Sequence, residues 1–374
     1  MNKDAYIANT NLFIHLLALY LNKKTTDLTI GEETFVFFAK FAKGHSLTAL
    51  LYQVLKETKV KVNKEQFKKL EDRYLLNVKK DVMYQAERKK LYAYLNENKV
   101  DFLPLKGIVV KDYWPDPSSR EFVDNDILFP DDKSKIVREF FINNNYAVEH
   151  YKKSNHDVYY KKPFITFEMH RDLFIDTGNT SKLAPYFSDY LRRSFVKKEC
   201  EREVNDEDFY IYFTTHTYKH FYNAGCGVRT LVDYYCFLKK KTNLDFNYIN
   251  QELEKIDLVD FSNQIKTLAI KTFDEEPLTD DEKEMLFYIV SSGTYGVLKN
   301  NVEKGIKEKG KFGYLMSRIF PPASFYKNAY PWAYKTKVLI PVAWLIRLFK
   351  IIFKSPKKAA KEIKMISKTK KKTN

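Results

Sequence analysis

The feature that most constrains the fold is a change of pattern near residue 100. Before that point, apolar residues recur at the three- and four-residue spacing of amphipathic helices. Between residues 100 and 170, short strand-like runs alternate with turn residues and short helical stretches. From about residue 209 the helical spacing returns. This order predicts an α+β fold, with a mixed-sheet core flanked by N-terminal and C-terminal helical regions.

These changes of pattern divide the chain into four parts. We expect a helical region over 1–99, an α/β core over 100–200, a helical domain over 201–300 and a C-terminal extension over 301–374. In the first part, one helical pattern covers Glu32 to Glu57, and a long helix is predicted from Lys64 to Asn98. The residues expected to face inward on the long helix are Leu70, Tyr74, Leu75, Val78, Val82 and Tyr84.

Five strand-like runs predict the sheet of the α/β core. A short helix ending near Tyr113 separates the first two runs, and a helix over Asp131 to Asn143 separates the second and third. Lys161 to Pro163 is expected to connect the last two runs as a hairpin. The predicted strands are Val100–Leu105, Phe122–Phe129, Tyr146–Tyr151, His156–Tyr160 and Phe164–His170.

The composition argues against a nucleic-acid partner despite the basic charge. The formal charge is 64 − 48 = +16, but residues 354–374 hold nine Lys and one Glu and so carry +8 of it. The remainder is mildly basic, and the sequence has no recognisable nucleic-acid-binding motif. Three cysteines without a C-x-x-C pair, and an N-terminus without a secretory signal, favour a cytoplasmic protein.

Two acids lie within a run of strand-forming residues. Asp124 and Asp126 are bracketed by Val123 and by Ile127–Phe129. Strand alternation places both carboxylates on one face, with their backbones about 6.6 Å apart. Acids are costly to desolvate unless they are paired or bind metal, and two-metal catalytic sites need a splayed carboxylate pair of this kind. The alternative is a pair of solvated acids on an exposed sheet face.

The last predicted strand offers a third carboxylate. Glu168 and His170 share one face of it, so Glu168 completes a three-acid metal site if this strand lies beside the strand of Asp124. His170 would then contact phosphate or orient Glu168; the alternative is a structural histidine. Glu149 and Asp172 are the rival third acids.

A strand-to-helix turn and one arginine supply the predicted phosphate contacts. Gly107 lets the backbone approach a phosphate at a helix N-terminus, where free N–H groups and a partial positive charge favour anions. Arg120, four residues before Asp124, is placed for a bidentate phosphate contact. We therefore expect Lys106, Gly107 and Arg120, together with His170, to contact phosphate groups, and hence the nucleotide if the family resemblance described next holds.

These motifs together resemble a known family. They are L-P-L-K-G over 103–107, Y-x-P-x-P from Tyr113, R-x3-D-x-D-I-L from Arg120 and E-M-H-R over 168–171. They resemble the bacterial uncharacterised nucleotidyltransferase family, a branch of the DNA-polymerase-β-like nucleotidyltransferase superfamily. The close likeness covers about residues 103–174, and a weaker likeness to the helical half of the family extends over residues 216–233.

The resemblance implies a metal-dependent enzyme. Asp124 and Asp126 would be the metal ligands, with Glu168 as the third acid or general base, and Mg²⁺ as the cofactor with Mn²⁺ as the alternative. Such an enzyme moves an NMP from an NTP to an acceptor and releases pyrophosphate. The acceptor would be a small molecule, a sugar or a lipid-linked group.

The sequence departs from the family pattern at two positions. Ile108 follows Gly107 where the superfamily favours Ser, which removes a hydroxyl contact to phosphate. Asn125 separates the acids where this family more often has an apolar residue. The first departure supports the alternative of a catalytically inactive binding or regulatory module. Four residues of the helical half either line the cleft or pack helices: His216, His220, Arg229 and Asp233.

The C-terminal extension carries one further prediction. The apolar run Val338–Phe353 has sixteen residues and is interrupted by Arg347 and Lys350, so it is shorter than the roughly 20 residues that span a bilayer. Trp344 and the following lysines suit a helix lying on an anionic membrane surface, at the inner leaflet. The alternative is a helix packed on the body of the protein.

Overall fold

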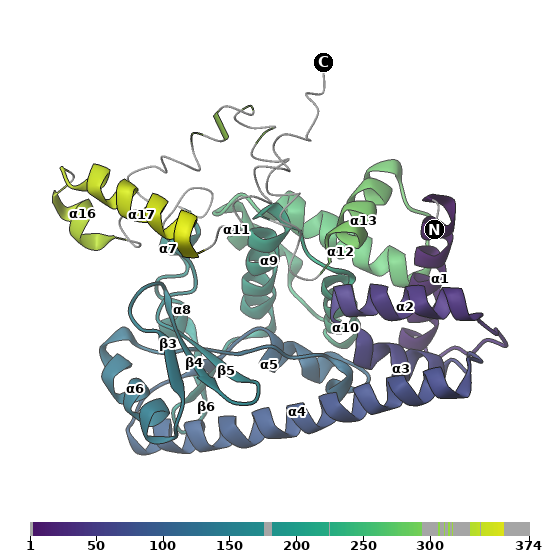
Figure 1. Cartoon of the computed structure of the whole chain (residues 1–374), viewed down its shortest axis with the longest axis horizontal. Helices are drawn as coiled ribbons and strands as arrows, with labels where there is room; N and C mark the ends of the chain where they lie inside the picture. The colour runs from purple at the N-terminus through teal and green to yellow at the C-terminus, as the bar shows by residue number, and fades with distance from the viewer. Residues whose placement is uncertain are drawn as a thin grey trace.

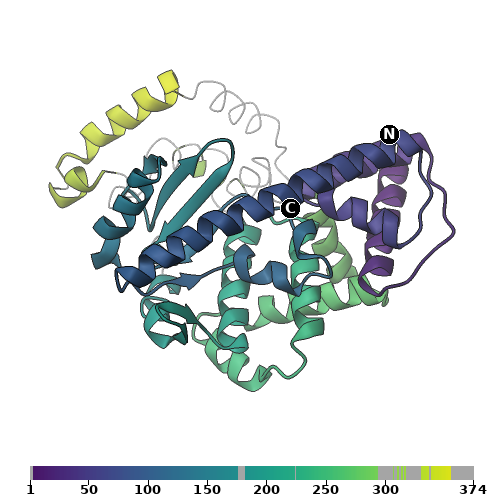
Figure 2. The ribbon, with the colours of Figure 1, turned by 90° about the horizontal axis from the view of Figure 1, so that it is seen from below.

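One long helix runs beneath the whole molecule. The computed structural model describes residues 3–175, 182–223, 225–293, 330–336 and 338–354, with 306, 310, 313, 314 and 316. Helix α4 (Lys64–Glu97), predicted to within one residue, extends along the lower side (Figures 1 and 2). Leu70 joins the core of the helical part, whereas Tyr84, Leu91 and Leu95 belong to the core under the sheet. The helix therefore ties the two cores together.

The buried face of α4 is not the one that its apolar residues predict. Leu75 and Val82, expected to face inward, are 52% and 59% exposed. A buried polar residue, Asp81, faces the α/β core instead, and Lys111 Nζ lies 2.8 Å from its Oδ1. Apolar periodicity cannot reveal such a face, because these charges are buried only through partners elsewhere in the chain.

The five predicted strands form one mixed sheet, which confirms the α+β fold. The order is β1-β2-β5-β4-β3, with β2 and β5 parallel and the other neighbours antiparallel. Helices α4 and α6 (Ser134–Asn143) cover one face of the sheet, and the opposite face borders a pocket. The strands are β1 (Leu103–Pro104), β2 (Asn125–Leu128), β3 (Ala147–His150), β4 (His156–Lys161) and β5 (Ile165–His170).

Helices from the two ends of the chain share one core. Leu17 of α1 and Leu268 of α12 are both fully buried in it. His45 Nε2 donates to the carbonyl of Val290, and its Nδ1 accepts from the backbone N–H of Val228, both at 3.1 Å. The helices are α1 (Lys3–Leu21), α2 (Glu32–His45), α3 (Thr48–Glu57), α9 (Asp206–Asn223), α10 (Val228–Lys240), α11 (Phe246–Glu254), α12 (Val259–Asp274) and α13 (Asp280–Ser292).

The helical pattern over Glu32–Glu57 is confirmed, and the structure divides it into two helices. Helix α2 ends at His45, and Ser46 takes the left-handed conformation with φ of 52°. Helix α3 then begins at Thr48 and packs on α2. The spacing of apolar residues continues across the break, so the pattern alone does not mark it.

Several short elements connect the strands and lead into α9. A two-stranded sheet, β6 with β7, is joined to the main sheet by a bridge between Phe102 and Glu201. The short elements are α5 (Gly107–Val110), α7 (Leu183–Tyr186), α8 (Tyr190–Arg193), β6 (Phe195–Lys198) and β7 (Glu201–Glu203).

The C-terminal extension contains a helical pair. Helices α16 (Pro331–Thr336) and α17 (Ile340–Lys354) enclose Ala333 and Ala343 between them. Val342, Leu345 and Ile346 of α17 are exposed. Within the described ranges, no helix is long and apolar enough to cross a membrane. The Lys-rich tail after Lys354 lies outside the described residues.

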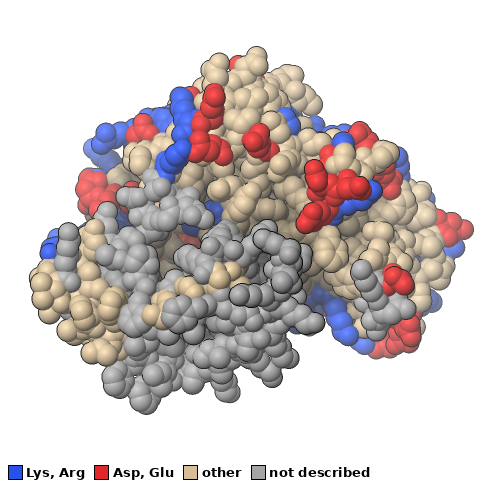
Figure 3. Space-filling model, turned by 90° about the horizontal axis from the view of Figure 1, so that it is seen from above, with Lys and Arg blue, Asp and Glu red and all other residues tan. Residues whose placement is uncertain are grey.

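The charged side chains are mixed on the face seen from above. Figure 3 shows Lys and Arg side chains interspersed with Asp and Glu over the described surface. On this face, the described basic side chains are not gathered into one patch.

Candidate active site

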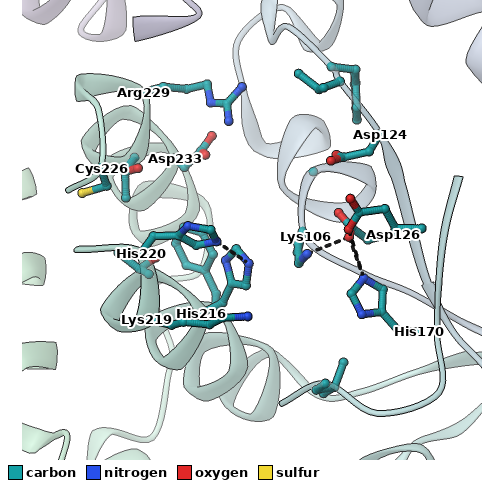
Figure 4. A pocket seen from close by; sticks show the side chains of 18 of the residues that line it. Lys106, Asp124, Asp126, His170, His216, Lys219, His220, Cys226, Arg229 and Asp233 are labelled. Carbon is teal, nitrogen blue, oxygen red and sulfur yellow. Dashed lines mark hydrogen bonds and ion pairs between the residues drawn. The ribbon is translucent and has the colours of Figure 1, made fainter. Parts of the chain in front are cut away.

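A pocket of about 340 Å³ lies between the open face of the sheet and helices α9 and α10. Figure 4 shows its two walls: the sheet side carries Asp124, Asp126, Lys106 and His170, and the helical side carries His216, Lys219, His220, Arg229 and Asp233. The residues discussed below that line it are Lys106, Gly107, Arg120, Asp124, Asp126, His156, Glu168, His170, His216, Lys219, His220, Arg229 and Asp233.

Strand pairing brings the predicted acids together. Asp124 directly precedes β2, and Asp126 is paired in register with Glu168 of the parallel neighbour β5. Registered residues of neighbouring strands face the same side of a sheet, so both carboxylates face the pocket. The rival acids do not line it: Glu149 is exposed on the edge strand β3, and Asp172 follows the end of β5.

Asn125, between the two acids, faces the opposite side of β2. Its Oδ1 accepts a hydrogen bond of 2.7 Å from Nη1 of Arg88 on α4. Both side chains are buried, so the pair fixes β2 on the long helix. The polar residue at this position therefore has a packing role and leaves the pocket face to the carboxylates.

The acids carry more negative charge than the pocket neutralises. Burial, and then the charge of Asp126, raises the pKa of Asp124 to about 6. Burial and the same neighbour raise the pKa of Glu168 to about 7. Burial also acts on Asp126, but Lys106 and His170 outweigh it and hold its pKa well below the usual range. Such shifts mark a site that gains from a bound cation.

Lys106 is the one ammonium bonded to these acids among the described residues. Its Nζ donates to Asp126 Oδ1 at 2.6 Å, and His170 Nε2 donates to the same oxygen at 2.8 Å. Burial lowers the pKa of Lys106, but Asp126 and Asp124 outweigh that and leave it raised. The backbone of Lys106 has φ of 44° and ψ of −118°, a conformation that costs about 1–3 kcal/mol and is typical of functional sites.

Arg120 is bound to an acid of the helical part. Its Nε and Nη2 donate to the two carboxylate oxygens of Asp233 on α10, at 2.8 and 2.9 Å. Trp114 Nε1 donates to the same carboxylate at 2.7 Å. A Cβ on Gly107 would lie 2.7 Å from Nη1 of Arg120. The absence of a side chain on Gly107 therefore leaves room for Arg120. The guanidinium of Arg120, predicted to bind phosphate, makes its bidentate contact with Asp233.

The helical wall faces the acids across the pocket. His216 and His220, one turn apart on α9, have their Nε2 atoms 3.0 Å apart. Lys219 between them makes no hydrogen bond or ion pair to any described residue, and its ammonium lies 5.9 Å from the ring centre of Phe174. Burial, and then the charge of Lys106, lowers the pKa of Lys219. All three side chains line the pocket (Figure 4).

The comparisons agree with this geometry. The sequence model of one family, described as uncharacterised nucleotidyltransferase, matches residues 33–274. The chain belongs to this family. The matched range includes the sheet, both walls of the pocket and α4. Among curated proteins and among solved structures, none matches the chain.

Two residues that line the pocket were not predicted from the sequence. His156 comes from β4, whose register sets it opposite His170. Lys219 lies inside the H-x3-H spacing of His216 and His220, where one lysine among many gives no signal of its own. Only the packing of α9 against the sheet distinguishes it from a solvated lysine.

The lining residues fit a divalent metal ion. Asp124 has no hydrogen bond or ion pair to any described residue, and Glu168 has no lysine or arginine partner there. Carboxylate oxygens are the ligands that Mg²⁺ prefers, and imidazole nitrogens also suit Mn²⁺. His156, Glu168 and His170 each offer one ligand atom, and these atoms lie within 4.8 Å of one another.

Proposed function

We propose that this protein is a metal-dependent nucleotidyltransferase that transfers an NMP from an NTP to an acceptor. The observation that carries the proposal is a pocket that three carboxylates line from two paired strands and the residue before one of them, with Lys106 bonded to Asp126. The acceptor is a hydroxyl or phosphate of a small molecule, a sugar or a lipid-linked group.

The sheet wall holds the reacting groups in this proposal. Asp124, Asp126 and Glu168 would bind Mg²⁺ or Mn²⁺. Divalent ions, when bound, supply positive charge that polarises the acceptor oxygen and neutralises the leaving pyrophosphate. The acceptor oxygen forms the new bond to the α-phosphorus, the bond from that phosphorus to the bridging oxygen breaks, and the acceptor proton is released.

The helical wall supplies the cation for the phosphates. Lys219 points into the pocket from α9 and has no anionic partner among the described residues. Arg229 of α10 lines the same wall, where its Nη1 donates to the carbonyl of Glu121 at 3.1 Å. Lys106 remains bonded to Asp126, and Arg120 positions helix α10 of the helical wall through its contact with Asp233. This assignment replaces the direct phosphate contact expected for Arg120.

The test is NTP binding by calorimetry with Mg²⁺ or Mn²⁺, followed by pyrophosphate release with candidate acceptors. Asp124→Asn is the sharpest variant, because Asp124 has no described partner to lose and the fold should tolerate the change. We expect metal-dependent NTP binding to fall by tenfold or more, on the order of 1.4 kcal/mol. Asp172→Asn, an acid outside the pocket, is the matched control. Equal NTP binding by wild type and Asp124→Asn contradicts the proposal.

The alternative is a binding or regulatory module that has lost turnover. Two features favour it: Lys106 Nζ sits on Asp126, where a metal would bind, and Ile108 replaces the hydroxyl common in the superfamily. A module of this kind would bind NTP and release no pyrophosphate with any acceptor. Pyrophosphate release that Asp124→Asn abolishes decides for the enzyme.

We also propose that the C-terminal extension attaches the protein to an anionic membrane surface. The exposed side chains of Val342, Leu345 and Ile346 give α17 an apolar face, and the sequence after it is rich in lysine. Each lysine near such a surface contributes about 1 kcal/mol at modest salt. Attachment there would bring a lipid-linked acceptor close to the pocket.

A further inference from the structure

Two imidazoles lie beside the third carboxylate of the pocket. His156 of β4 is paired in register with His170 of β5, and their ring centres are 5.0 Å apart. Glu168 Oε2 lies 3.8 Å from His156 Nε2 and 3.7 Å from His170 Nε2. Three ligand atoms from two neighbouring strands thus surround one small volume at the sheet wall.

These separations are slightly wider than the spacing of ligands around one metal ion, and all three ligand atoms lie within 4.8 Å of one another. With metal–ligand bonds of about 2.1 Å, neighbouring ligand atoms lie about 3.0–3.4 Å apart and opposite ones about 4.2 Å. The two separations from Glu168 exceed the neighbouring values by less than about 1 Å. Side-chain rotation alone can close such a difference.

The donor set selects the kind of metal. The Nε2 atoms of His156 and His170 both face Glu168, and a neutral imidazole offers a metal the lone pair of such a nitrogen. Mg²⁺ prefers oxygen ligands and keeps its waters, whereas imidazole suits first-row transition metals such as Mn²⁺ and Zn²⁺. A site of two imidazoles and one carboxylate therefore discriminates against Mg²⁺.

We propose that His156, Glu168 and His170 form a transition-metal site that binds Mn²⁺ in preference to Mg²⁺. The proposal rests on the proposed function only in that Glu168 is a metal ligand of the same pocket. The Oδ1 of Asp126, 2.8 Å from His170 Nε2, is placed to add a fourth ligand. The metal of this nucleotidyltransferase is then held partly by nitrogen and not by carboxylates alone.

The two histidines differ in where the ring proton must lie when Nε2 coordinates a metal. His170 Nε2 donates to Asp126, so coordination through that atom moves the ring proton to Nδ1, which is buried and has no partner among the described residues. His156 Nε2 faces Glu168, and its Nδ1 lies 3.2 Å from Asn155 Oδ1, which can accept a hydrogen bond from the N–H at that position. A metal-ligating histidine usually donates its other N–H in this way. His156 is therefore the residue to test.

The experiment is an electron paramagnetic resonance titration of the full chain with Mn²⁺, without nucleotide. We expect pulsed spectra of bound Mn²⁺ to show coupling to ¹⁴N, and Mg²⁺ to displace it only in large excess. His156→Gln should weaken Mn²⁺ binding about tenfold or more and reduce the ¹⁴N coupling. His150→Gln, an exposed histidine on β3 of the same sheet, is the matched control and should change neither.

The outcomes separate this proposal from the proposed function. Bound Mn²⁺ without ¹⁴N coupling, equal affinity for Mg²⁺, or unchanged binding by His156→Gln each overturns the imidazole site. The first two readouts use the wild-type protein, so a variant that fails to fold does not remove them. A ¹⁴N-coupled Mn²⁺ site in a protein that binds no NTP leaves the site standing and overturns the nucleotidyl-transfer assignment.

Discussion

Replacing Asp233 with Ala should destabilise the protein by about 4 kcal/mol. The carboxylate accepts two hydrogen bonds from Arg120 and one from Trp114, and all three residues are buried. Removing one partner of a buried ion pair costs about 3–5 kcal/mol, because the remaining charge stays desolvated. The orphaned indole N–H adds to this cost, but the contributions share one carboxylate and do not sum. A domain with an unfolding free energy of about 5–15 kcal/mol would stay folded after a loss of this size, but with a small remaining stability if it starts near the lower value.

Urea unfolding followed by circular dichroism measures the effect. Arg120→Met and the double variant Arg120→Met/Asp233→Ala complete a double-mutant cycle. We expect the double variant to lose less than the sum of the single changes, with a coupling of about 2–3 kcal/mol. Asp27→Ala breaks an exposed ion pair with Lys61 and should cost less than about 1 kcal/mol.

The reasoning fails if Asp233→Ala costs no more than the exposed control. It also fails if Arg120→Met leaves stability unchanged and abolishes NTP binding. That second result would return Arg120 to the direct phosphate contact expected from its position in the sequence. A large loss of stability in both single variants, with coupling between them, supports the structural role.

Four further outcomes follow from the structure. Gly107→Ala should lower the free energy of unfolding by about 1–3 kcal/mol, because its Cβ would meet the guanidinium of Arg120; thermal unfolding measures this. Burial lowers the pKa of His45 to about 4, below its unfolded value. The contribution of the neutral His45 ring to the free energy of unfolding is therefore present above about pH 6.5 and is lost as the pH falls toward 4. The loss is at most about 3 kcal/mol, and urea unfolding of His45→Asn should show a flatter pH dependence over that interval. Lys219→Ala should weaken NTP binding about tenfold or more by calorimetry, and unchanged affinity would remove it from the phosphate site. Leu345→Asp should reduce sedimentation with anionic liposomes at low salt without changing NTP binding; wild-type protein that ignores such liposomes contradicts membrane attachment.

The sequence by itself determined the elements of the fold and the face of each acid. Strand alternation is a local rule, so Asp124 and Asp126 could be assigned to one face without any knowledge of the neighbouring strands. The same rule placed Glu168 and His170 together on β5. The long helix and the five strands were predictable because their residues repeat with the period of the backbone itself. The break at Ser46 was not, since the apolar spacing runs through it.

Only the tertiary structure decided which charges meet. Arg120 finds Asp233 across 113 positions of the chain, and His156 reaches Glu168 only because β4 pairs with β5. Lys219 becomes a pocket residue through the packing of α9 against the open face of the sheet. Hydrogen bonds and ion pairs require their partners to lie within a few ångströms of each other. For residues distant in sequence, this proximity depends on how helices and strands pack, which no local spacing of residues encodes.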